Sequence, residues 1–331
     1  MTGFSLAIAI SSISFLLSTI WGEPFIKLLT TFNIGKQIRD DQPATHRKKE
    51  DTPTMGGFMF LVPITLLTVI LNAVSLFGSR LLGSSILVPL AALWAFSVIG
   101  AIDDWEGIRG SRRGLGMKAN TKFILQVIAG LALAYTIKEV LQVPHLFWPA
   151  SDAPLDFGWA YLPIATVIIV GMANAVNFTD GVDGLASIIS MTAFGIYGII
   201  GLMQGQVYLG RFCFCVVGAL AGFLWFNCHP ARLFMGDTGS QALGASLAVV
   251  ALMTGRWLLL PLIAIIPMAE LLSVIIQVAY FKITKGKRVF MRAPIHHHFE
   301  EIGWTESQIV IRFWIIELVS AMLGLSLTFI R

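Results

Sequence analysis

Apolar residues run through the chain in continuous blocks, each about as long as a helix needs to cross a bilayer. A transmembrane helix takes about 20 apolar residues, whereas a transmembrane β-barrel shows short strands that alternate apolar and polar positions. Ten blocks can be drawn, at residues 4–29, 55–76, 82–102, 121–141, 159–176, 185–203, 211–227, 239–255, 257–281 and 312–330. The pattern predicts an all-α integral membrane protein with about ten transmembrane helices.

Composition agrees with a membrane protein. The 331 residues are 56% hydrophobic and only 13% charged, whereas soluble domains carry about 25% charged residues. This excludes a soluble globular protein, and such an apolar chain is not disordered in water. No internal repeat or linker divides the sequence, so we expect one polytopic domain over residues 1–331.

The distribution of basic residues predicts the orientation. Ten crossings place every second connection on the same face of the membrane. Most of the 23 Lys and Arg residues fall in the connections that follow the first, third, fifth, seventh and ninth blocks. Basic residues concentrate on the cytoplasmic side of membrane proteins. We therefore expect these connections to be cytoplasmic and both termini to lie on the external face.

Two adjacent carboxylates, Asp103 and Asp104, end the third apolar block on the basic face. The C-terminus of a helix disfavours negative charge, so the pair needs a nearby cation. Mg²⁺ prefers carboxylate and phosphate oxygens and suits such a pair. Solvation at a helix end, or ion pairs with Arg109, Arg112 and Arg113, is the alternative interpretation.

Polar residues also interrupt the chain between the fifth and sixth blocks. Asn177, Asp180 and Asp183 lie within seven residues of one another, together with two glycines. Glycine lets a ligand approach the backbone closely, and Asn and Asp supply donors and acceptors for a polar head group. A capped turn between two helices would explain Asp183 and Gly184, but it leaves Asn177 and Asp180 without a role.

A third polar segment begins at Asn227 and leads into the eighth block. Asp237 lies in the run Gly-Asp-Thr-Gly-Ser where a helix is expected to start. The free N–H groups of a helix N-terminus favour phosphate, so this run is a plausible phosphate and metal site. Phe234 beside it could stack on a nucleobase, although packing at the membrane interface is the commoner role of a single aromatic residue.

Three consecutive histidines, His296 to His298, follow the ninth block. Consecutive side chains point in different directions, which disfavours three ligands on one zinc ion. Contacts with an anionic substrate fit better. Within the ninth block, Glu270 follows Pro267, and the proline predicts a kink that could open a lateral groove. An ionisable group at membrane depth is a candidate functional residue, with pairing inside the bundle as the alternative.

The first basic connection ends in Thr52-Pro-Thr-Met-Gly56-Gly57, at the entrance of the second block. The preceding run of basic residues could simply bind anionic lipid. The hydroxyl groups and glycines need a further reason, and we expect something to approach the chain closely there.

Together these segments resemble the polyprenyl-phosphate N-acetylhexosamine-1-phosphate transferase superfamily. The matching segments occur in the family's order and are residues 52–57, 103–104, 177–185, 234–240 and 294–300. The unbroken histidine triplet and the segment from Thr52 resemble the branch that transfers muropeptides. One departure follows the Asp pair, where Trp105-Glu106-Gly107 lacks the Lys common in relatives, which leaves Arg109 and Arg112 as substitutes.

The resemblance implies a Mg²⁺-dependent phosphoryl transfer in the bacterial cytoplasmic membrane, with the active site facing the cytoplasm. Phospho-MurNAc-pentapeptide would pass from UDP-MurNAc-pentapeptide to undecaprenyl phosphate, giving lipid I and UMP. The implied catalytic residues are Asp103, Asp104, Lys122, Asp237, His296, His297 and His298, with Asp237 and Asp104 as metal ligands. The implied substrate-binding residues are Thr52, Gly56, Asn177, Asp180, Asp183, Asn227, Phe234 and Glu270.

Two other functions are weighed against this one. A related transferase could move GlcNAc-1-phosphate or another sugar phosphate. A secondary transporter would place its polar residues near the bilayer midplane, often in repeated halves, which the sequence does not show. The expected partners are the two substrates and the bilayer, with a homodimer as an open alternative and no nucleic acid.

Overall fold

The computed structural model describes residues 3–35, 52–75, 84–109, 116–143, 145–148 and 154–328. Most of these residues are helical. The long helices are α1 (Gly3–Thr31), α3 (Gly57–Ser75), α4 (Leu87–Arg109), α5 (Ala119–Tyr135), α6 (Tyr161–Thr179), α7 (Leu185–Met203), α8 (Val207–Asn227), α9 (Gly236–Met253), α11 (Ile265–Ile283) and α13 (Glu306–Leu327). The short helices α10 (Leu260–Ile263) and α12 (Ile295–Glu301) lie on either side of α11 in sequence, and β1 (His145–Phe147) pairs antiparallel with β2 (Pro154–Asp156).

Every one of the ten apolar blocks overlaps a helix, which confirms the all-α membrane class apart from the small β1–β2 sheet. Eight helices in the described part of the chain are long and apolar enough to cross a membrane. The other two are α3, whose apolar stretch is shorter, and α9. The count of ten crossings, the membrane side of each terminus and the single-domain assignment stay predictions.

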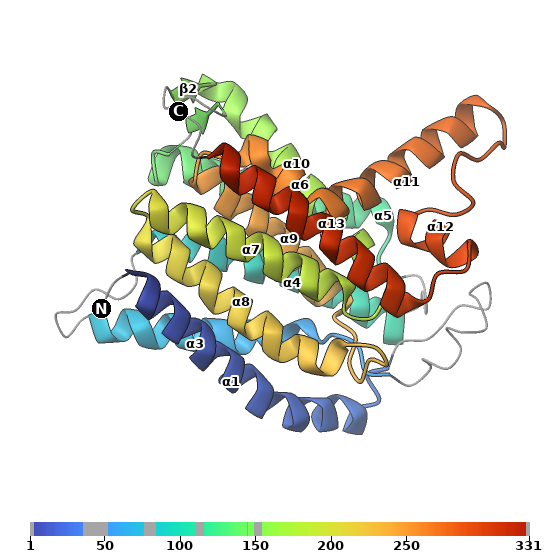
Figure 1. Ribbon diagram of the computed structural model, residues 1–331, viewed down its shortest axis with the longest axis horizontal. Helices are drawn as coiled ribbons and strands as arrows, with labels where there is room; N and C mark the ends of the chain where they lie inside the picture. The colour runs from blue at the N-terminus through green and yellow to red at the C-terminus, as the bar shows by residue number, and fades with distance from the viewer. Residues whose placement is uncertain are drawn as a thin grey trace.

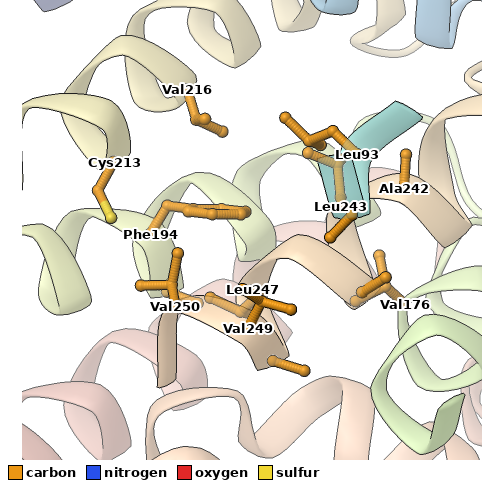
Figure 2. Close-up of a cluster of buried hydrophobic side chains, with 14 of the residues drawn as sticks. Leu93, Val176, Phe194, Cys213, Val216, Ala242, Leu243, Leu247, Val249 and Val250 are labelled. Carbon is orange, nitrogen blue, oxygen red and sulfur yellow. The ribbon is translucent and has the colours of Figure 1, made fainter. Parts of the chain in front are cut away.

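Helix α9 forms the centre of the bundle. Every residue from Thr238 to Met253 is buried, and Figure 2 shows Leu243, Leu247 and Val250 of this helix near Phe194 of α7. Small residues let its neighbours come close. A Cβ atom at Gly244 would lie 2.2 Å from the Met172 carbonyl oxygen of α6, and one at Gly100 of α4 would lie 2.1 Å from the Asp237 carbonyl oxygen.

The ninth block is broken, as its prolines predict, but the break lies at Ala264 rather than at Pro267. Helix α10 ends at Ile263 and α11 starts at Ile265, with Ala264 in a non-helical conformation between them. Pro267 falls in the first turn of α11, where its missing N–H costs no helical hydrogen bond. The tenth helix begins at Glu306, six residues before the predicted start, because Thr305 and Gln308 form a capping box.

The elements that carry the predicted site gather at one end of the bundle (Figure 1). α11 leans out from the other helices and leads to α12, at the right of the view, and α8 ends at that same end. α1 begins and α13 ends at the left of the view. The apolar helices thus hold the polar segments together at a single end of the molecule.

Candidate active site

Asp104 holds the N-terminus of α9. One oxygen of its carboxylate accepts a hydrogen bond from the Asp237 N–H at 3.1 Å. The other accepts from the Thr238 N–H at 3.0 Å and from the Thr238 hydroxyl at 2.6 Å. The first N–H groups of a helix have no partner within the helix, and a negative charge is favourable there. Asp104 on α4 therefore caps α9 and fixes the backbone of Asp237.

Asp237 is the centre of a polar cluster drawn from four helices. Lys122 of α5 forms an ion pair with it and also lies 3.4 Å from an Asp103 carboxylate oxygen. The amides of Asn177 and Gln241 each donate to Asp237 at 2.8 Å. Between 16% and 23% of each of the Asp103, Lys122 and Asp237 side chains is exposed, so a substrate can reach the cluster.

A chain of three amides behind Asp237, two of them buried, was missed by the sequence reasoning. Asn174 donates to Gln126 at 2.9 Å, Gln126 donates to Gln241 at 2.9 Å, and Gln241 donates to Asp237. Each amide fixes which way the next one points, so the chain orients the Asp237 carboxylate. Gln126 and Gln241 do carry a sequence signal, because a polar residue inside an apolar block is a candidate functional residue.

Asp103 is oriented by the segment that precedes α5. Its carboxylate accepts a hydrogen bond from the Met117 N–H at 2.9 Å. Gly116 has a φ of +63°, and a Cβ atom there would lie 2.9 Å from an Asp103 oxygen. Only glycine allows this approach at low cost. Of the basic residues suggested as its ion-pair partners, Arg112 and Arg113 lie outside the described residues.

The charges in the cluster fit a divalent cation. Asp103, Asp104 and Asp237 supply three carboxylates, and Lys122 is the ammonium group that bridges two of them. The remaining negative charge and the hard oxygen donors match the preferences of Mg²⁺. Asp237 and Asp103 face the Lys122 ammonium, whereas the hydrogen bonds that Asp104 accepts come from the N-terminus of α9.

Glu270 and His296 are paired with each other inside the protein. His296 Nδ1 lies 3.1 Å from the Glu270 carboxylate, and the exposed fractions of the two side chains are 1% and 0%. The pair joins α12 to α11. A Cβ atom at Gly181 would lie 2.2 Å from His296 Nε2, so His296 also packs against the turn between α6 and α7. Glu270 is thus paired inside the bundle, as the alternative interpretation of the sequence predicted. Contacts of Glu270 and His296 with a substrate stay predictions.

The other two histidines turn to different neighbours. His297 Nδ1 lies 2.6 Å from a Glu300 oxygen and about a fifth of each side chain is exposed. Burial lowers the pKa of His297 below its usual range, and the Glu300 hydrogen bond only partly opposes this shift. A neutral imidazole is therefore favoured near neutral pH. His298 accepts a hydrogen bond from the Met291 N–H at 3.3 Å and packs beside Phe290.

The segment from Thr52 packs directly on the segment from Phe234. The N–H groups of Gly56 and Gly57 donate to the carbonyls of Phe234 and Met235, both at 2.9 Å. A Cβ atom at Gly56 would lie 2.4 Å from the Phe234 carbonyl oxygen, which gives this glycine a packing role. Thr52 and Phe234 are both partly exposed next to this contact.

Asn227 and Asp183 organise the loop between α8 and α9. Asn227 is buried, donates to the Leu233 carbonyl at 2.9 Å and accepts from the Ser187 hydroxyl at 2.8 Å. Asp183 accepts from the Ala231 N–H at 3.2 Å. Asp180 is the C-cap residue of α6 and is partly exposed. The substrate-binding roles of these three residues stay predictions.

A cavity of about 720 Å³ opens between α11 and the segment that leads to α12. Its lining combines the apolar side chains of Val274 and Phe281 with the basic side chains of Lys282, Arg288 and Arg292. Such a lining suits a molecule that carries both an apolar part and negative charge.

Comparison with known proteins agrees with this geometry. Residues 86–255 match the profile of glycosyl transferase family 4. A phospho-N-acetylmuramoyl-pentapeptide-transferase of Chloroflexus aurantiacus is 42% identical, over 98% of this chain and 90% of its own length. The enzymes of that name from Geobacillus thermodenitrificans and Halalkalibacterium halodurans are 42% and 39% identical, each over 95% of both chains.

The fold and these matches define a multi-pass membrane protein that is a phospho-sugar transferase of glycosyl transferase family 4. Within that class, the chain belongs to the phospho-N-acetylmuramoyl-pentapeptide transferase family.

Proposed function

We propose that this protein transfers phospho-MurNAc-pentapeptide from UDP-MurNAc-pentapeptide to undecaprenyl phosphate, forming lipid I and releasing UMP. The observation that carries the proposal is the cluster of Asp103, Lys122, Asn177 and Asp237 at one end of a bundle of apolar helices. There, a lipid phosphate held at the membrane surface can meet a soluble nucleotide sugar. The two predicted alternatives, a GlcNAc-1-phosphate transferase and a transporter, lack this support from the relatives.

The transfer needs positioning and charge neutralisation more than covalent help. A phosphate oxygen of the lipid attacks the phosphorus that bears the sugar. The bond from that phosphorus to the bridging oxygen breaks, and UMP leaves with the electron pair. The lipid phosphate is mostly a dianion at neutral pH, since its second pKa is about 6. We therefore favour direct attack, with Asp103 removing a remaining proton, over an aspartyl-phosphate intermediate.

The proposed metal is Mg²⁺, and Asp237 is its proposed ligand. Asp104 would hold the backbone of Asp237 in place through the hydrogen bond from the Asp237 N–H. When bound, Mg²⁺ supplies positive charge to the diphosphate. Lys122 supplies a second positive charge, and the amides of Gln241 and Asn177 keep the Asp237 carboxylate in place. Asn177, Asp180 and Phe234 are proposed to contact the uridine end of the substrate, and His297 a phosphate or the sugar. The site is proposed to face the cytoplasm of a bacterial inner membrane.

The test is UMP release by the purified protein from UDP-MurNAc-pentapeptide. We expect release only when undecaprenyl phosphate and Mg²⁺ are both present. UDP-GlcNAc serves as the comparison substrate under the same conditions. UMP release from UDP-GlcNAc, with none from UDP-MurNAc-pentapeptide, would instead assign the protein to the related GlcNAc-1-phosphate transferases.

A further inference from the structure

Glu270 of α11 holds His296 of α12 at two points. Its Oε2 atom lies 3.1 Å from the ring Nδ1 and accepts a hydrogen bond from the His296 backbone N–H at 3.4 Å. That N–H belongs to the first turn of α12, where the N–H groups have no acceptor within the helix. One carboxylate of α11 therefore sets both the start of α12 and the direction of the His296 ring.

The pair is closed off from solvent. The exposed fractions of the His296 and Glu270 side chains are 1% and 0%, and His296 is the only ion-pair partner of Glu270 in the described part of the chain. A carboxylate buried in this way is costly unless it is paired. Because its oxygens are covered by protein, Glu270 acts on the site through His296 rather than by touching a substrate.

The other side of the His296 ring packs on the turn between α6 and α7. An ionised carboxylate only accepts hydrogen bonds, so Nδ1 is the donor to Glu270 and Nε2 lies on the far side of the ring. A Cβ atom at Gly181 would lie only 2.2 Å from Nε2, so position 181 must lack a side chain. Gly181 directly follows Asp180, which is proposed to contact the uridine end of the substrate.

A small apolar cluster joins the same elements. Val182 of the turn and Leu185 of α7 are buried in it together with Phe313 of α13, and Ile295 and Phe299 of α12 pack against it. Helix α12 is thus attached to the turn by this cluster and by the His296 ring. A shift of α12 would therefore shift the turn as well.

From these contacts we propose that Glu270 is a positioning residue for the nucleotide end of the site. It orients His296, and His296 holds the turn that carries Asp180. The kink near Pro267 suggested a groove for the lipid tail beside Glu270, whereas its contacts lead to the nucleotide. The inference rests on the proposed function, because it takes Asp180 to contact the uridine end.

The test measures UMP binding to the purified full-length protein by calorimetry in the presence of Mg²⁺, together with the KM of each substrate. Glu270→Leu removes both hydrogen bonds to His296, and we expect the Kd for UMP to rise by about 10-fold because the turn is no longer ordered in advance. KM for UDP-MurNAc-pentapeptide should rise in proportion, whereas KM for undecaprenyl phosphate should not change. Glu270→Gln retains an oxygen that can accept both hydrogen bonds and should restore most of the affinity.

A double-mutant cycle shows whether Glu270 acts through His296. His296→Asn places an NH₂ group about where Nδ1 lies, so it can still donate to Glu270, but it lacks the ring atoms that pack on Gly181. This variant should weaken UMP binding about as much as Glu270→Leu does. Because the two residues act as one unit, the variant with both substitutions should bind UMP no more weakly than His296→Asn alone.

Glu317→Leu is the matched control, since it removes another fully buried carboxylate, which accepts from the Ile266 N–H at the start of α11. It should lower the Tm and leave the Kd for UMP unchanged, which separates positioning from a general loss of stability. Gel filtration checks that each variant is folded. If Glu270→Leu is not, Glu270→Asp decides, because its carboxylate is one methylene too short to reach His296 and should weaken UMP binding.

The proposal is wrong if the Glu270 variants bind UMP as tightly as the wild type, or if KM rises for undecaprenyl phosphate instead of the nucleotide sugar. It is also wrong if the losses multiply in the double variant, or if Glu317→Leu weakens UMP binding equally. In each of these cases the wild-type protein still binds UMP, and the proposed function stands. A wild-type protein that binds no UMP would overturn the proposed function and this inference with it.

Discussion

Asp237 depends on more partners than any other residue of the candidate site that we describe. Its two oxygens receive the Lys122 ammonium and the amides of Asn177 and Gln241, while its own N–H is held by Asp104. These contacts come from α4, α5, α6 and α9 itself. The position of one carboxylate is thus set by four helices, which is how a membrane bundle can hold a reactive group in a fixed place.

Replacing Asp237 with Asn should remove almost all turnover. The substitution keeps the shape but removes the negative charge, and it places an NH₂ group near donors from Lys122 and Gln241. We expect kcat for UMP release to fall by about 100-fold or more, with a weaker dependence on Mg²⁺ concentration. Turnover close to that of the wild type would reject Asp237 as the metal ligand.

A substitution of Gln126 tests whether the chain of amides behind Asp237 positions its carboxylate. Gln126→Leu leaves the Gln241 and Asn174 amides without their partner, so Asp237 loses its fixed orientation. We expect kcat to fall by about 10-fold, as small displacements of reacting groups do, while KM for the nucleotide changes little. Gln204→Leu is the control, because Gln204 bonds to the Thr254 carbonyl away from the site. An equal loss in both variants, or a change in KM alone, would argue against positioning.

The sequence predicted the acidic and basic members of the cluster and the Asn177 amide, but not the amides of Gln126 and Gln241. Asp103, Asp104 and Asp237 could be found because charge at the edge of an apolar block needs an explanation, whereas Lys122 was implied only by the family resemblance. Gln126 and Gln241 lie inside such blocks, and their value depends on facing each other across two helices. The spacing of residues within one helix cannot show which residue of another helix each glutamine will contact. The convergence of the charged residues is seen in the structure, and their catalytic roles stay predictions.

At the scale of elements, the break before α11 is stabilised from another helix. The first N–H groups of α11 lie inside the bundle and have no helical acceptor. The Glu317 carboxylate of α13 accepts from the Ile266 N–H at 3.0 Å, and the Glu317 side chain is fully buried. In the sequence, Pro267 indicates a break in the helix. Glu317, whose carboxylate stabilises that break at Ala264, lies fifty residues further along the chain. The break could be predicted, whereas its position could not.

Glu317 should therefore matter for stability through its oxygen rather than its charge. Glu317→Leu leaves the α11 N–H groups without an acceptor in an apolar setting, at a cost of about 1–3 kcal/mol. Glu317→Gln retains a carbonyl oxygen and should unfold close to the wild-type Tm. Thermal unfolding in detergent compares the two. Equal destabilisation by Leu and Gln would show that the charge, and not the cap, is what stabilises the break.

At the scale of the whole molecule, the central position of α9 explains why this helix is not among those long and apolar enough to be recognised as membrane spans. A helix surrounded by protein does not need the apolar side chains that lipid requires, and it gains from small residues that permit close packing. The Gly, Ser and Gln residues of its first half therefore serve packing and the site rather than membrane contact. The apolar blocks indicated a helix there, but only the structure shows that the other helices enclose it.

The orientation of the molecule can be tested with its own cysteines. Cys228 follows α8 at the end that carries the site and is exposed, whereas Cys213 and Cys215 are buried within α8. If that end faces the cytoplasm, a thiol reagent that cannot cross membranes should label Cys228 in inverted vesicles but not in right-side-out vesicles.

Gln204→Cys in a Cys228→Ser background places the only exposed thiol among the described residues at the other end of α8, and the labelling pattern should reverse. Cys228→Ser alone measures labelling of the buried cysteines. Labelling of Cys228 in right-side-out vesicles would contradict the orientation that the basic residues predict, and the active site would then face outward.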